Sequence, residues 1–143
     1  MDVFCTLAIN SSSQNSLPSG LFLAKANTRI EFTDNDRPER KAQRERWRKG
    51  GIPIRRDLPR YWWQICSDEF VSSDDINAHL IWILGHLRKD RLLSDLKSDG
   101  YSYLFSVFWG ASNGTGGGPL ITTDLAKLLV IHNAELAIGF YVK

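Results

Sequence analysis

The sequence is poor in cysteine, in long apolar runs and in net charge, and each shortage excludes a class of protein. Its 143 residues contain two cysteines, Cys5 and Cys66, without CxxC spacing, so we expect neither a disulfide framework nor a cysteine metal site. We expect both thiols to be reduced and packed as small core side chains. No apolar run approaches the roughly 20 residues that a bilayer-spanning helix needs. Because Asp2 is acidic and no basic region precedes the first apolar residues, we expect no signal peptide and a cytoplasmic location.

The formal net charge of +2 is small, but it is unevenly distributed along the chain. Residues 37–60 carry ten basic and three acidic side chains, a net charge of +7, which leaves −5 for the remainder. A field of this kind can steer the approach of a charged partner.

Alternation of apolar and polar residues predicts four β-strands. The alternation is strongest in "YSYLFSVFW", where Tyr101, Tyr103, Phe105, Val107 and Trp109 share one face. An aromatic face of this size has to be covered by other elements in water. The predicted strands span residues 3–9, 61–67, 101–109 and 134–142.

Three segments are predicted to be helical. The clearest helix is capped by Ser72 or Ser73 and ends at Gly100, with a bend or break near residues 88–91. The other two helices are predicted at residues 21–26 and at about 122–132.

The basic part of the chain is predicted to lack regular structure. Proline and glycine interrupt residues 33–60 repeatedly, so we expect an irregular, basic loop there. Within it, residues 39–47 could form a helical turn or two, but their charge leaves little apolar face.

Strands and helices alternate along the chain, which indicates an α+β fold. We expect one compact domain over residues 1–143, with about four mainly antiparallel strands in a sheet and about three helices packed on it. A strand, a loop and a leucine-containing helix occur near the N-terminus and again after residue 101. The fold could therefore contain a βαβ-like pseudo-repeat.

No set of residues has the spacing of a catalytic or metal-binding site. The glycine loop at residues 113–118 lacks the lysine of a phosphate-binding loop. His79 and His86 are seven residues apart, too far to share a metal directly on one helix, and His132 is placed at a helix end. We expect structural roles for all three histidines. The prediction is a protein that is not an enzyme, with no catalytic residues, no metal and no cofactor.

Basic and aromatic side chains are interleaved in residues 44–63, "RERWRKGGIPIRRDLPRYWW". This composition suits a nucleic-acid backbone and its bases, a protein partner, or an exposed loop whose long side chains cover apolar neighbours. The residues alone leave these three interpretations open.

Four motifs occur in a characteristic order: "WRKGG" at residues 47–51, "YWWQICSDE" at 61–69, "DDINAHLIWILGHLRKDRLLSDLKSDGYSYLFSVFW" at 74–109 and "TTDLAKLLVIHNAELAIGFYV" at 122–142. This order resembles the bacterial family called domain of unknown function 4279, over residues 3–142. The chain departs from that family at residues 33–46, which are longer and more charged, and at "SLPSG", where the family has an acidic helix start.

The resemblance implies a small cytoplasmic protein without an established enzymatic activity. Some members of that family are immunity proteins encoded beside polymorphic, Rhs-type or type VI secretion toxins. An immunity protein binds one toxin and occludes its active site or target surface, which requires no catalytic residues. The alternative is a non-enzymatic nucleic-acid- or ligand-binding module that uses residues 37–60.

Two groups of side chains are predicted to bind a partner if the chain is an immunity protein. The structural alternative for Trp47, and likewise for Trp62, is core packing, which we expect to be the commoner role. The basic group is Trp47, Arg48, Lys49, Arg55, Arg56 and Arg60, and the competing acidic group is Asp68, Glu69, Asp74 and Asp75.

Overall fold

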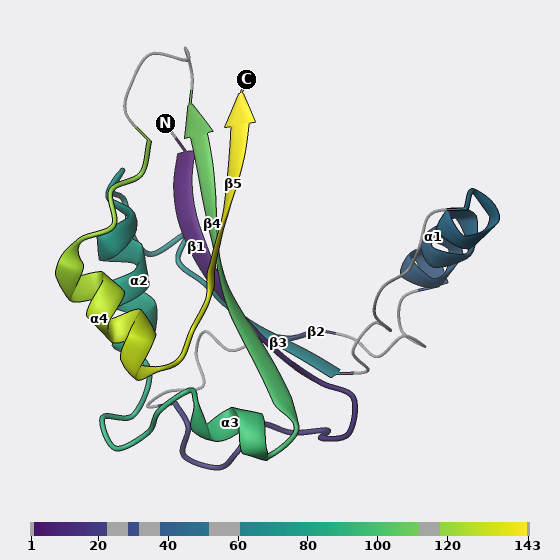
Figure 1. Ribbon diagram of the computed structural model, residues 1–143, viewed down its shortest axis with the longest axis horizontal. Coiled ribbons are helices and arrows are strands. Elements are labelled where there is room, and N and C mark those ends of the chain that lie inside the picture. Colours follow the sequence, from purple (N-terminus) through teal and green to yellow (C-terminus); the bar gives the residue numbers. More distant parts are fainter. Residues whose placement is uncertain (1, 23–28, 32–37, 52–60, 112–117, 143) are drawn as a thin grey trace.

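A mixed β-sheet forms the centre of the molecule, and Figure 1 shows its strands and helices. The computed structural model describes residues 2–22, 29–31, 38–51, 61–111 and 118–142. The strands are β1 (Asp2–Ser11), β2 (Arg29–Glu31), β3 (Tyr61–Cys66), β4 (Tyr101–Ala111) and β5 (Leu136–Val142). The helices are α1 (Pro38–Lys49), α2 (Ile76–Leu84), α3 (Asp95–Ser98) and α4 (Thr123–Ile131).

The sheet has the strand order β2-β3-β1-β4-β5. Its pairings are antiparallel except for the parallel pair of β4 and β5, which α4 connects. The α+β class and the four predicted strands are confirmed, and β2 adds a fifth, short strand. The sheet is therefore mainly antiparallel, as expected.

The core lies on the side of the sheet that faces α2, α3 and α4, which we call the helix-facing side. Alternate residues of β1, from Val3 to Ile9, and of β4, from Tyr101 to Trp109, are buried there. Val3 pairs with Trp109 and Leu7 with Phe105, so the buried faces of the two strands coincide. Burial of this apolar surface is the main stabilising term of the fold.

Helix α2 begins later and ends earlier than the sequence pattern predicts. The predicted caps Ser72 and Ser73 are wrong, because the Asp75 carboxylate accepts from the Asn77 backbone N–H at 3.0 Å and caps the helix. The helix ends at Gly85, before the predicted break near residues 88–91. A separate short helix, α3, then precedes Gly100, whose φ of +86° suits glycine.

The prediction of an irregular loop over residues 33–60 is wrong for α1. This helix begins at Pro38, a favourable first helical residue, and its last turn carries Arg46, Arg48 and Lys49, which suit the negative end of the helix dipole. Glu, Lys, Arg, Gln and Ala also have high intrinsic helix propensity. Local propensity and charge placement therefore favour a helix that has no continuous apolar face.

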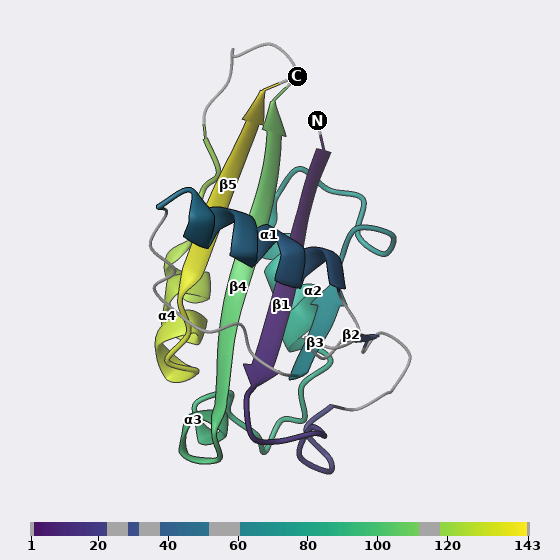
Figure 2. The same ribbon diagram turned by 90° about the vertical axis from the view of Figure 1, so that its right-hand side faces the viewer.

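Helix α1 lies on the side of the sheet opposite α2 and α4, as Figures 1 and 2 show from perpendicular directions. The described side chains near its C-terminal end, from Glu45 to Lys49, are exposed. Helices α2, α3 and α4 thus share one side of the sheet, and α1 lies on the other.

Both cysteines are free thiols, as predicted. Cys5 is fully buried, and burial raises the pKa of its thiol to about 12. Cys66 is only partly buried on the opposite side of the sheet, so its expected core position is wrong.

Most of the predicted helix at 21–26 and most of the glycine loop lie outside the described residues, so the pseudo-repeat stays a prediction.

His132 links α4 to the loop before α3. Its Nδ1 accepts the Leu93 backbone N–H at 3.1 Å, and its carbonyl oxygen accepts the Tyr103 hydroxyl at 2.6 Å. Burial lowers the pKa of His132 from its ordinary value of 6.5. The His132 ring therefore binds a proton less readily in the folded protein than in the unfolded chain.

This difference predicts an acid-dependent loss of stability. The contribution of His132 is complete above pH 6.5 and is lost as the pH falls through its lowered folded-state pKa. We expect the free energy of unfolding, measured by urea denaturation, to fall between about pH 7 and pH 5. The fall should be smaller in His132→Gln, which does not titrate. Equal slopes for the two proteins would contradict this role.

Candidate functional site

A hollow of about 720 Å³ opens at the end of β1 that extends beyond β3. β1 pairs with β3 only from Thr6 onward, while Asp2, Val3 and Phe4 pair with β4. Where β3 ends, the chain turns away toward α2 and leaves space beside the start of β1. We call this space the acidic hollow; its described lining residues are Asp2, Val3, Phe4, Asp68, Glu69, Phe70, Val71, Ser72, Ser73, Asp74 and Phe108.

Ser67 fixes the point at which the chain leaves the sheet. Its backbone N–H donates to the Cys5 carbonyl at 3.0 Å, and its hydroxyl accepts the Cys5 N–H at 2.9 Å. Its carbonyl then accepts the N–H groups of Phe70 and Val71, which closes a turn. These bonds hold the first part of the segment 67–74 against β1.

His79, fully buried on α2, holds the other part of this segment. Its Nε2–H donates to the Ser73 carbonyl at 2.7 Å, and its Nδ1 lies 2.7 Å from the Ser67 hydroxyl. Because a carbonyl only accepts, Nε2 carries a proton, and in the tautomer protonated there alone Nδ1 accepts from the Ser67 hydroxyl. One histidine therefore ties both ends of the segment to α2.

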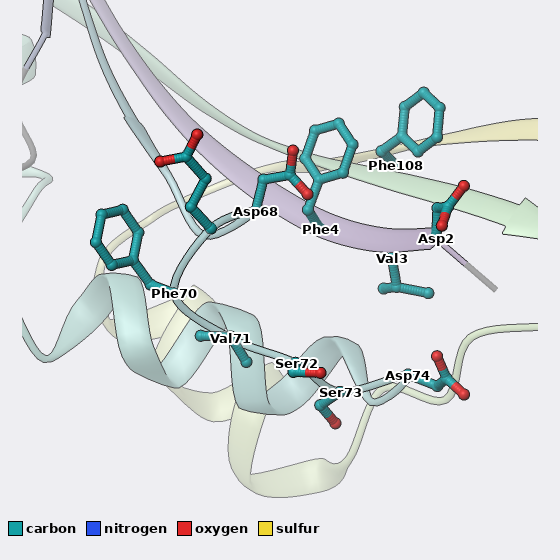
Figure 3. A pocket seen from close by; sticks show the side chains of 11 residues that line it. Asp2, Val3, Phe4, Asp68, Phe70, Val71, Ser72, Ser73, Asp74 and Phe108 are labelled. Carbon is teal, nitrogen blue, oxygen red and sulfur yellow. The ribbon is translucent and has the colours of Figure 1, made fainter.

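Aromatic rings form the sheet side of the acidic hollow. Phe4 and Phe108 stack with their ring centroids 4.6 Å apart and their planes 10° apart. Figure 3 shows these two rings on one side of the space and Val71, Ser72 and Ser73 across from them. Phe70, which is 56% exposed, lies at one end. The hollow thus offers apolar surface to a partner as well as charge.

The stacked row continues across the side of the sheet that α2 and α4 leave uncovered. Phe108 also stacks on Tyr141 of β5, with centroids 3.9 Å apart. A shallower groove of about 420 Å³ runs along this row and shares Phe4 and Phe108 with the acidic hollow. The two spaces form one continuous surface over β1, β4 and β5.

Three of the four predicted acidic residues meet at this hollow. Asp68, Glu69 and Asp74 are exposed and line it. Asp75 does not line it, because its carboxylate caps α2 and accepts from both the backbone and the side chain of Asn77. No basic side chain belongs to the described residues that line the hollow. The site therefore favours a cationic group over an anionic one.

The basic group is only partly described. Trp47, Arg48 and Lys49 are exposed at the C-terminal end of α1 and do not line the acidic hollow. Trp47 is 44% exposed, so its expected core packing is wrong, whereas Trp62 of β3 is half-buried. The predicted residues Arg55, Arg56 and Arg60 lie outside the described residues. The described members of the basic group thus do not line the hollow at which Asp68, Glu69 and Asp74 meet.

Sequence patterns missed Asp2, Phe4, Phe70 and Phe108 as site residues. Phe4 and Phe108 are the outward-facing members of two alternating strands, so their positions on one side of the sheet follow from alternation. Their proximity depends on the register of β1 with β4, in which Phe4 pairs with Phe108. No short sequence motif encodes that pairing.

The histidines occupy structural positions, as predicted. His79 and His132 are buried and hydrogen-bonded, and His86 Nδ1 lies 2.8 Å from the Trp82 carbonyl. Within the described part of the chain, no three histidine, cysteine or carboxylate side chains gather where they could hold a metal ion. No helix in that part is long and apolar enough to span a bilayer.

Comparison of this chain with protein-family models, with curated proteins and with solved structures finds no match.

The role of Ser67 generates a stability prediction. Ser67→Ala removes the partner of the buried Cys5 N–H and leaves His79 Nδ1 without a donor, so we expect a loss of about 1–3 kcal/mol in the free energy of unfolding. Ser72→Ala, at an exposed position in the same segment, should change it by less than about 0.5 kcal/mol. Urea denaturation measures both. Equal stability of the two variants would show that Ser67 does not anchor the segment.

Proposed function

We propose that this chain is a cytoplasmic immunity protein that binds and neutralises a bacterial polymorphic, Rhs-type or type VI secretion toxin. The acidic hollow is the observation that carries this proposal. It combines exposed carboxylates from Asp68, Glu69 and Asp74 with the exposed ring of Phe70 and the stacked rings of Phe4 and Phe108. Such a surface suits a protein partner, because charge orients the encounter while apolar area supplies affinity.

The mechanism is occlusion of the toxin and not conversion of a substrate. A toxin that acts on nucleic acid or another anionic target needs a basic surface around its active site. The acidic hollow would take a lysine or arginine of that surface, whose cation is attracted both to the carboxylates and to the faces of aromatic rings. Covering the basic surface then keeps the target away.

The resemblance to domain of unknown function 4279 agrees with this role, since some members of that family are immunity proteins. The proposal does not depend on a catalytic group. The Ser67 hydroxyl and the His79 ring are 2.7 Å apart, and both residues are fully buried.

A second function is favoured by α1. This helix carries six basic and two acidic residues, and Trp47 is exposed on it. The exposed basic side chains of Arg46, Arg48 and Lys49, together with an aromatic side chain, could bind a nucleic-acid backbone and stack on a base. Salt-sensitive binding of RNA or DNA by the isolated protein, lost in Arg46→Ala/Arg48→Ala/Lys49→Ala, would support this alternative over the immunity proposal.

Co-expression tests the immunity proposal directly. We expect the reading frame beside this gene to encode a toxin that stops growth, and we expect co-expression of this chain to restore growth. A neighbouring toxin that still kills the co-expressing cells would contradict the proposal, as would a gene neighbourhood without a toxin.

Charge-neutralising variants test whether the acidic hollow is the binding surface. Asp68→Asn/Glu69→Gln should lower the association rate with that toxin at least about tenfold at low salt, because it weakens electrostatic steering. Asp99→Asn/Glu135→Gln changes the total charge equally at exposed positions that do not line the hollow, so it is the matched control. Surface plasmon resonance measures both rates. Equal rates for the two variants would place the interface elsewhere.

A further inference from the structure

Strand β5 forms one edge of the sheet, as Figure 2 shows, and β2 forms the other. β2 is three residues long, whereas β5 is seven residues long and reads LAIGFYV. Natural edge strands are commonly protected by charged side chains, by proline or by being short. β5 has none of these protections.

The backbone of β5 alternates in direction between β4 and the outer edge. The Phe105 N–H donates to the Glu135 carbonyl at 3.2 Å, so odd-numbered residues turn their backbone groups toward β4. The even-numbered residues Leu136, Ile138 and Phe140 therefore turn their N–H and C=O groups outward. An extended chain is the structure that satisfies such a row of donors and acceptors.

Apolar side chains are exposed on β5 and at the end of the helix that precedes it. Phe140 is 63% exposed and Tyr141 is 51% exposed, on opposite sides of the strand. Val130, which is 78% exposed, and Ile131 lie at the end of α4, which leads directly into β5. Exposed aromatic rings on both sides of an edge strand suit a surface that another chain covers.

We propose that β5 pairs antiparallel with β5 of a second copy of this chain, so that two sheets join into one across a two-fold axis. The side chains of β5 carry no charge, so two copies of the strand do not repel each other and the strand does not attract a charged partner in preference. The carboxylates that line the acidic hollow belong to β1 and to the segment 67–74, and none of them belongs to β5. A two-fold antiparallel pairing also lets one surface complement itself.

The alternation of β5 specifies the centre of this pairing. Ile138 turns both backbone groups outward, so two copies of Ile138 can exchange both hydrogen bonds across the axis. In that register Phe140 of each chain lies opposite Leu136 of the other, on the helix-facing side. The exposed Phe140 ring is then covered by an apolar neighbour.

Light scattering across the micromolar range tests the proposal. We expect the wild-type chain to be a dimer and Phe140→Lys to weaken dimerisation at least about tenfold, because a charged edge residue opposes strand pairing. Ile81→Lys is the matched control, since Ile81 is a 56% exposed apolar residue on α2. A wild-type monomer would overturn the proposal, and so would equal weakening by both variants.

Amide hydrogen exchange identifies the interface without relying on a variant. Pairing at this edge should slow exchange of the outward amides of Ile138 and Phe140 as the protein concentration rises, while the inward amides of Ala137 and Gly139 stay protected throughout. A dimer in which the outward amides exchange fast would contradict the proposal. This test uses no toxin, so a negative result would contradict the dimer and leave the immunity proposal unaffected.

Discussion

Burial of the helix-facing side of β1 and β4 is the constraint on which the rest of the structure depends. Leu7 and Phe105 are almost completely buried there, and a slip of one residue would turn the apolar set of the shifted strand outward. The same register places Phe4 beside Phe108 on the side of the sheet opposite α2 and α4. The pairing that forms the core therefore also builds the aromatic side of the acidic hollow.

The sequence predicts the strands well because every second residue of β4 is apolar and this alternating set is the one that the fold buries. It predicts α1 poorly, since charge and propensity, without an apolar face, stabilise that helix. It misplaces the cap of α2 because Ser72, Ser73 and Asp75 can all accept a backbone N–H, and only the fold selects Asp75. Asp68, Glu69 and Asp74 are visible as an acidic cluster, but the hollow needs Phe4 and Phe108 from distant strands.

Charge and apolar surface are distributed over different parts of the molecule. The acidic hollow combines carboxylates with aromatic rings, α1 displays basic side chains with Trp47, and β5 exposes uncharged backbone and apolar side chains. Each surface suits a different kind of partner. A charged surface favours a partner of opposite charge, whereas an open strand edge favours a partner segment in an extended conformation. Under the two proposals, one small fold would bind a toxin at one surface and a second copy of itself at another.

An NMR titration of the labelled protein with its proposed toxin partner tests the central claim most directly. If the acidic hollow is the binding surface, the largest amide shifts should fall at residues 2–4 and 67–74, with smaller shifts at residues 123–131. The opposite distribution, with residues 2–4 and 67–74 unchanged and shifts concentrated in α1 or α4, would contradict the account.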